Sequence, residues 1–149
     1  MIVWHAQEHP ASCVAACVRM ALTEFGQHLA EVEIRRMLGN PRFGLTLRQS
    51  SVRIEQAGGT AVWHEDWNLD DLRESLRLGD FPIVGIERRF FGHPAAAHAV
   101  VLISVSSHQI EYLDPLDGPD VRQTSLDTFL RAWHATGQEA LLILSRLPE

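Results

Sequence analysis

The sequence predicts an α+β fold in which N-terminal helices pack on a C-terminal antiparallel sheet. In the first half of the chain, apolar residues recur at the three-to-four-residue spacing of amphipathic helices. In the second half, β-branched and apolar runs are separated by short turns. Helices and strands do not alternate regularly along the chain, which argues against a doubly wound parallel sheet.

Five helices are expected, and turn and capping residues mark their ends. Thr46 and Ser125 are N-cap candidates. Gly39-Asn40-Pro41 and Gly58-Gly59 end the helices that precede them. The expected helices cover residues 14–25, 29–38, 47–57 and 126–133, and a further helix is expected to start at Asn68 or Asp70 and to run to Leu78.

Five strands are expected, and two of them form a hairpin. Residues 98–103 are apolar and rich in β-branched side chains, residues 109–113 alternate between polar and apolar, and residues 105–108 form the turn between them. Residues 88–97 are expected to be a loop, and residues 115–119 a turn. The other expected strands cover residues 60–63, 81–86 and 140–144.

Composition indicates one domain spanning residues 1–149. The chain is 46% hydrophobic and 21% charged, which is enough apolar material for one core. The formal charge of −6 argues against a nucleic-acid surface, because the pairs Arg35-Arg36 and Arg88-Arg89 are too short to form basic patches.

The sequence predicts a cytoplasmic protein with no membrane span. Its longest apolar candidate, residues 95–105, is much shorter than the ~20 residues that a span requires. The first five residues lack the basic region and apolar core of a secretory signal.

Cys13 and Cys17 are four apart on one expected helix, where their side chains lie too far apart for a disulfide. Cys17 is therefore interpreted as a small buried hydrophobe.

Cys13 is the candidate nucleophile. Ser12 is a good N-cap, and Pro10 separates the preceding residues from the helix, so Cys13 is expected at the helix N-terminus, where a thiolate is stabilised. Gln7 lies on the loop that enters this helix. Its side-chain amide can donate to the oxyanion that forms when Cys13 attacks a carbonyl.

His98 and Asp114 are the candidate base and orienter. In the predicted hairpin, the start of the first strand lies beside the end of the second, which brings His98 close to Asp114. A carboxylate that accepts from one ring nitrogen fixes the tautomer of the imidazole and leaves the other nitrogen for the thiol.

Three segments resemble a known group, the bacteriocin-processing, double-glycine leader peptidases of the papain-like cysteine peptidases. These segments are residues 7–20, the HAVVL sequence at 98–102, and Asp114-Pro115. The resemblance implies a papain-like fold, with Cys13 as nucleophile, His98 as base, Asp114 as orienter and Gln7 as oxyanion donor. It also implies cleavage after a small-residue pair such as Gly-Gly. The family usually has Asp-Cys-Gly where this chain has Ser12-Cys13-Val14.

The leading interpretation is a stand-alone cysteine peptidase that cleaves a precursor peptide or small protein through a Cys13 acyl-enzyme, with no cofactor. Family members are commonly the N-terminal domain of an export transporter, and this sequence contains no transporter. Two alternatives stay open: a catalytically silent domain that binds a leader or partner peptide, and an acyltransferase that uses the same triad.

A structural zinc site is the rival interpretation of the cysteines. His5, His9, Cys13 and Cys17 recur every four residues and would form a stripe of ligands on one continuous helix. Pro10 should break that helix between the histidines and the cysteines. The sequence therefore favours the nucleophile, and no metal is expected.

Overall fold

The computed structural model describes residues 2–39 and 44–148, and it confirms the α+β class. Its sheet is antiparallel, in the order β1-β6-β2-β3-β4-β5. The helices are α1 (Cys13–Thr23), α2 (Glu31–Met37), α3 (Leu47–Gln56), α4 (Leu69–Arg77) and α5 (Leu126–His134), with a short 3₁₀ helix η1 (Arg88–Phe91). The strands are β1 (Ala61–His64), β2 (Ile83–Glu87), β3 (Ala97–Val105), β4 (Gln109–Leu113), β5 (Arg122–Ser125) and β6 (Ala140–Ile143).

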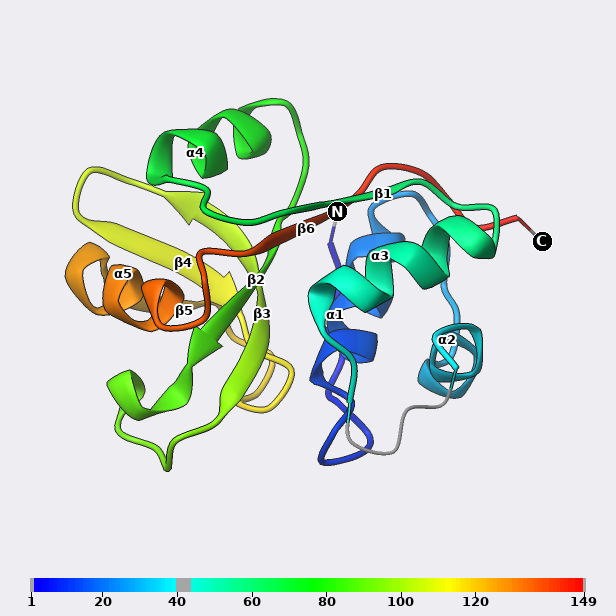
Figure 1. The fold of residues 1–149 in the computed structure, drawn as a ribbon, viewed down its shortest axis with the longest axis horizontal. Helices are drawn as coiled ribbons and strands as arrows, with labels where there is room; N and C mark the ends of the chain where they lie inside the picture. Colours follow the sequence, from blue (N-terminus) through cyan, green and yellow to red (C-terminus); the bar gives the residue numbers. More distant parts are fainter. Residues whose placement is uncertain (1, 40–43, 149) are drawn as a thin grey trace.

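Helices cover both faces of the sheet (Figure 1). Helices α1, α2 and α3 gather on one side, where Val101 and Ile83 of the sheet join their core. Helices α4 and α5 lie on the other side, where Val100 and Val84 point. Consecutive residues of β2 and β3 therefore enter opposite cores, as the alternation of side chains along a strand requires. The prediction that N-terminal helices pack on the sheet holds for the face that α1, α2 and α3 cover.

Local capping explains why several helices begin where the sequence predicts. Thr46 and Gln49 form a reciprocal capping box at α3, and Asn68 and Asp71 form another at α4. Ser125 caps α5 by accepting from the Thr128 backbone N–H. Each cap satisfies backbone donors that the first helical turn leaves free.

Four local predictions need correction. Strand β5 was not predicted, because its four polar residues are largely exposed and lack an apolar alternation. Residues 88–97, expected as a loop, contain η1. Helix α2 begins at Glu31 rather than at Leu29. The Ser12 side chain does not cap α1, because it bonds elsewhere. Of the predicted stop after α2, Gly39 is in the left-handed region, while Asn40 and Pro41 lie outside the described residues.

No helix in the part of the chain that the structure describes is long and apolar enough to cross a membrane.

Strands β3 and β4 pair as the predicted hairpin, with Val101 opposite Leu113. This register places the start of β3 beside the segment that follows β4. The hairpin thus brings together two parts of the chain that carry candidate site residues.

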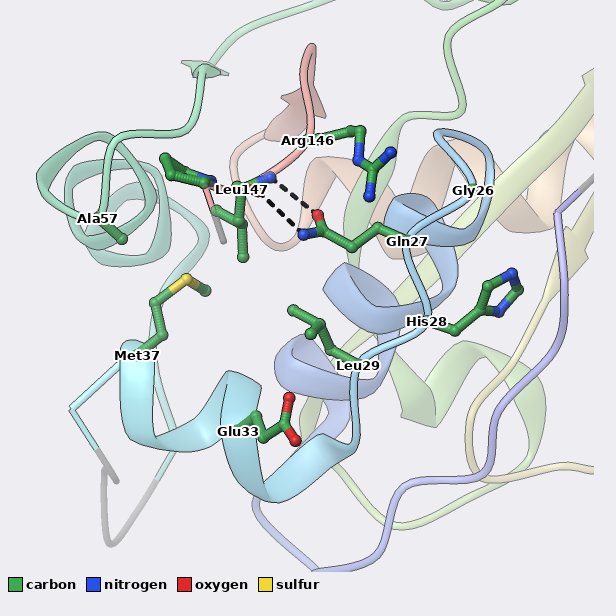
Figure 2. Close-up of a pocket in the computed structure, with 10 residues that line it drawn as sticks. Gly26, Gln27, His28, Leu29, Glu33, Met37, Ala57, Arg146 and Leu147 are labelled. Carbon is green, nitrogen blue, oxygen red and sulfur yellow. Dashed lines mark hydrogen bonds between the residues drawn. The ribbon is translucent and has the colours of Figure 1, made fainter.

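Gln27 attaches the C-terminal segment to the end of α1. Its side-chain Nε2 donates to the Leu147 carbonyl at 2.9 Å, and its Oε1 accepts from the Leu147 N–H at 2.8 Å (Figure 2). The Gln27 side chain is buried. Both backbone groups of Leu147 therefore depend on one buried amide.

Gln27→Ala is expected to lower the free energy of unfolding by about 2 kcal/mol, because it leaves two buried backbone groups without partners. Urea unfolding of the purified chain measures this change. Gln56→Ala, at an exposed position in α3, is the matched control and should change it by less than about 0.5 kcal/mol. Equal stability of the two variants would contradict a structural role for Gln27.

Candidate active site

Cys13 is the first residue of α1, and it is partly exposed. The first helical hydrogen bond at this end runs from the Ala16 N–H to the Ser12 carbonyl, so the N–H groups before Ala16 are free of helical partners. The Cys13 thiol lies close enough to His98 for the imidazole to lower the pKa of the thiol, both by hydrogen bonding and by its charge. A thiol here lies at the positive end of the helix and beside an imidazole, the two features that stabilise a thiolate.

His98 and Asp114 are in direct contact. The Nε2 atom of His98 lies 2.7 Å from Oδ1 of Asp114, and both side chains are buried. Oδ1 also accepts from the Leu116 N–H at 2.9 Å. Because Nε2 faces the carboxylate, Nδ1 is the ring nitrogen left for Cys13. The structure therefore brings Cys13, His98 and Asp114 together in one chain of contacts.

The pKa values of the three groups shift as an ion pair requires. Burial alone would raise the pKa of Cys13, but the hydrogen bond and charge of His98 outweigh it, and the net shift is downward. Burial alone would lower the pKa of His98, whereas hydrogen bonds to Asp114 and Cys13 raise it to about 9. Burial would also raise the pKa of Asp114, and the bond from His98 lowers it. The shifts of Cys13 and His98 therefore favour their ionised forms, a thiolate beside an imidazolium.

A cleft with a volume of about 490 Å³ opens onto Cys13 and His98. Its walls come from the loop before α1, the start of α3, strands β2 and β3, and the segment between α5 and β6. Six described residues that line it are glycine or alanine: Ala11, Gly44, Gly85, Ala96, Ala97 and Ala99. An extended peptide with small side chains can approach the thiol closely along such a wall.

Gln7 lines the same cleft, but its amide donors are engaged. Nε2 donates to the carbonyls of His9 at 3.0 Å and Pro10 at 3.2 Å, while the buried Oε1 has no hydrogen-bond partner in the described chain. An amide nitrogen has two donor hydrogens, and two loop carbonyls lie within hydrogen-bond distance of it here. Gln7 can donate to an oxyanion only after it leaves at least one of them.

Glu31 and Trp4 hold the site together, and sequence reasoning missed both. The fully buried Glu31 carboxylate accepts from the Glu8 N–H at 3.1 Å and the Ser12 hydroxyl at 3.2 Å. It thereby anchors the loop that leads into Cys13. The Trp4 indole N–H donates to the Asp114 carbonyl at 2.8 Å. Glu31 carried one available signal, because it is an acidic residue in the first turn of the helix expected over residues 29–38, but nothing in the sequence indicated its partners.

Cys17, His5 and His9, which the alternative zinc interpretation combined with Cys13, are not part of the contacts among Cys13, His98 and Asp114. Cys17 is fully buried, and its Sγ donates to the Ala99 carbonyl at 3.4 Å. Helix α1 begins at Cys13, so His5 and His9 are not on the same helix as the cysteines. Within residues 2–39 and 44–148, no group of three or more His, Cys, Asp or Glu side chains is placed to hold a metal ion.

Solved structures share this fold. A protein described as a C39-like peptidase from Bacillus anthracis has a TM-score of 0.76 at 14% identity, covering 99% of this chain and 98% of its own. The peptidase domain of Streptococcus ComA, a bi-functional ABC transporter involved in a quorum sensing pathway, has a TM-score of 0.76 at 16% identity, with 98% and 100% covered. A double glycine motif protease from an AMS/PCAT transporter, in complex with the leader peptide, has a TM-score of 0.72 at 17% identity, with 97% and 93% covered.

No curated protein matches the sequence significantly. Residues 2–144 match the family model described as "Peptidase C39 family". This match covers the loop with Gln7, the start of α1, and the β3–β4 hairpin with His98 and Asp114. The chain therefore belongs to the peptidase C39 family.

Proposed function

We propose that this chain is a cysteine peptidase that cleaves a peptide bond through an acyl-enzyme on Cys13. The observation that carries the proposal is the contact chain from Cys13 through His98 to Asp114, at the edge of an open cleft. Membership of the peptidase C39 family agrees with it. The proposal includes activity of this chain without an attached transporter.

In the proposed reaction, the Cys13 thiolate attacks the carbonyl carbon of the scissile bond, and the carbonyl oxygen becomes an oxyanion. The protonated His98 then gives its proton to the leaving amine, and the C–N bond breaks to leave a thioester. Neutral His98 then takes a proton from water as the water attacks the thioester. The C–S bond breaks and releases the acid product, which leaves the Cys13 thiolate beside the protonated His98. Asp114 holds the imidazole and stabilises its charged form.

The oxyanion needs donors, and the start of α1 offers them. The Cys13 backbone N–H precedes the first helical hydrogen bond and belongs to the positive end of the helix. We propose Gln7 as the second donor, after its amide rotates away from a loop carbonyl. The buried Oε1 atom of Gln7 has no hydrogen-bond partner in the described chain, which is energetically unfavourable and favours rotation of the amide.

The proposed substrate is a precursor peptide or small protein with an extended segment cut after a small-residue pair. The glycines and alanines of the cleft leave room for the peptide backbone beside the thiol. One structural neighbour was solved in complex with a leader peptide, which supports a peptide ligand in this fold. Large side chains on both sides of the bond would fill the space that these small residues leave.

Synthetic peptides with an internal Gly-Gly pair test the proposal. The purified chain is expected to cut after the pair, and replacing it with Leu-Leu should reduce kcat/KM about 100-fold or more, since a misplaced scissile bond costs about that much. Mass spectrometry identifies the products. Two fragments whose masses sum to the peptide plus one water indicate hydrolysis. Products joined to an added amine indicate acyl transfer, and tight binding without products indicates a binding domain; either would contradict the proposal.

A further inference from the structure

One charged side chain in the wall of the cleft takes no part in the proposed chemistry. Glu139 lies at the start of the segment that enters β6, and it lines the cleft that contains Cys13 and His98. We propose that Glu139 is a specificity-determining residue that binds a cationic side chain, lysine or arginine, of the peptide substrate. This inference rests on the proposed peptidase function and adds a charge preference to it.

Glu139 is held in place by a neighbouring aromatic side chain. Its Oε1 accepts from the indole N–H of Trp63 at 2.9 Å. The Arg48 guanidinium packs over the Trp63 ring, 5.2 Å from its centroid, and helps to fix the indole. A carboxylate oriented in advance loses less conformational freedom when it binds a ligand.

The second carboxylate oxygen is available to a ligand. In the described part of the chain, Glu139 Oε2 has no hydrogen-bond or ion-pair partner. It lies 4.0 Å from the point that a Cβ atom would occupy on Gly85, which also lines the cleft. The neighbouring Thr136 hydroxyl is occupied, because it donates to the carbonyl of Gly85 at 2.7 Å. The space above Gly85 is therefore bordered by an unpaired carboxylate oxygen.

This space lies close to the scissile bond. Gly85 of β2 pairs with Ala99 of β3, the residue after His98. Neighbouring strands are about 4.8 Å apart and an extended peptide advances about 3.3 Å per residue, so Glu139 faces a substrate side chain within about three residues of the cut.

The charge of Glu139 favours a cation at this point of the cleft. The other charged side chains among its described lining residues are Arg88 and His98. Arg88 acts near Asp114, whose pKa its charge helps to lower. Glu139 is thus the acidic group that a substrate side chain meets near Gly85. A lysine or arginine there gains an ion pair in a partly desolvated site, whereas a glutamate is repelled.

Peptidyl chloromethyl ketones test the inference without requiring turnover. The thiolate of Cys13 displaces chloride from the probe and forms a stable thioether. Probes ending in Gly-Gly carry lysine, glutamine or glutamate at the third or fourth residue from the reactive group. Intact-mass spectrometry measures the second-order rate of labelling. At one of these positions, lysine is expected to react faster than glutamate by on the order of tenfold.

Glu139→Gln is the decisive variant, because an amide oxygen can still accept from Trp63 while the charge is lost. It should abolish the lysine preference and leave labelling by the glutamine probe unchanged within about twofold. Glu65→Gln, at an exposed position outside the cleft lining, removes the same charge and should keep the preference. Equal rates for all three probes on the unaltered chain, or a preference that survives Glu139→Gln, would overturn the inference. Failure of every probe to label Cys13 would instead contradict the peptidase function on which it rests.

Discussion

Cys13→Ala is expected to reduce peptide cleavage by on the order of 10⁶-fold, because the acyl-enzyme cannot form without the nucleophile. The partly exposed side chain lies at the start of α1, and alanine is a good helix residue, so folding should be preserved. The measurement is kcat/KM on a peptide that the unaltered chain cuts. Circular dichroism and thermal unfolding verify that the variant is folded.

Cys17→Ala is the matched control for this prediction. Cys17 lies one helical turn after Cys13, is fully buried, and burial raises the pKa of its thiol well above the usual range. The variant should keep cleavage within a few-fold while losing about 1 kcal/mol of stability from the lost packing. A folded Cys13→Ala protein that still cut the peptide would exclude Cys13 as nucleophile. Loss of cleavage in folded Cys17→Ala alone would place the reactive thiol one turn away.

His98→Ala is expected to change the pH dependence of Cys13 alkylation. In the unaltered chain, the pKa of Cys13 is lowered and that of His98 is raised to about 9, so the thiolate–imidazolium pair persists from below the ordinary thiol range up to about pH 9. Without His98, burial is left as the main influence, and it raises the pKa of the thiol. At pH 6, alkylation by iodoacetamide should slow by about tenfold or more, since each pKa unit changes the thiolate fraction tenfold.

The difference between the two proteins should shrink above pH 9, because the thiol of the variant ionises as the pH rises and because His98 loses its proton there, which removes the ion pair. Peptide mass spectrometry between pH 4 and 10 reads Cys13 and Cys17 separately. Buried Cys17 should react slowly in both proteins. Identical profiles for Cys13 with and without His98 would show that the imidazole does not stabilise the thiolate. The same variant should cut peptides about 10²- to 10⁴-fold more slowly, the usual contribution of a general base.

The sequence by itself determined most of the fold, because local physics acts over a few residues. Thr46 and Ser125 cap helices at the predicted positions, and the alternating run at 109–113 is β4. Local sequence patterns did not predict β5, because Arg122–Ser125 has no alternation of apolar and polar residues. Only its pairing with β4 makes this segment a strand. The coverage of both sheet faces also depends on which residues of α4 and α5 meet β2 and β3, a long-range relation that no local pattern contains.

The sequence likewise predicted some features of the candidate site and not others. The hairpin rule placed His98 near Asp114, and the contact at 2.7 Å agrees. The helix start at Cys13 followed from Pro10. Sequence reasoning did not foresee that Ser12 would bond Glu31 instead of capping α1, or that the Gln7 amide would donate to His9 and Pro10. These choices depend on which buried polar groups lack partners after the chain has packed.

Only the tertiary structure decided what surrounds the thiol. Glu31, Trp63 and Glu139 are distant from Cys13 in the sequence, and each is placed by contacts across the fold. Residue types and short-range spacing therefore identified the groups that can do chemistry. Packing decided how they are held and which charges a substrate meets, because hydrogen bonds and electrostatic interactions depend on distance in space rather than on separation along the chain.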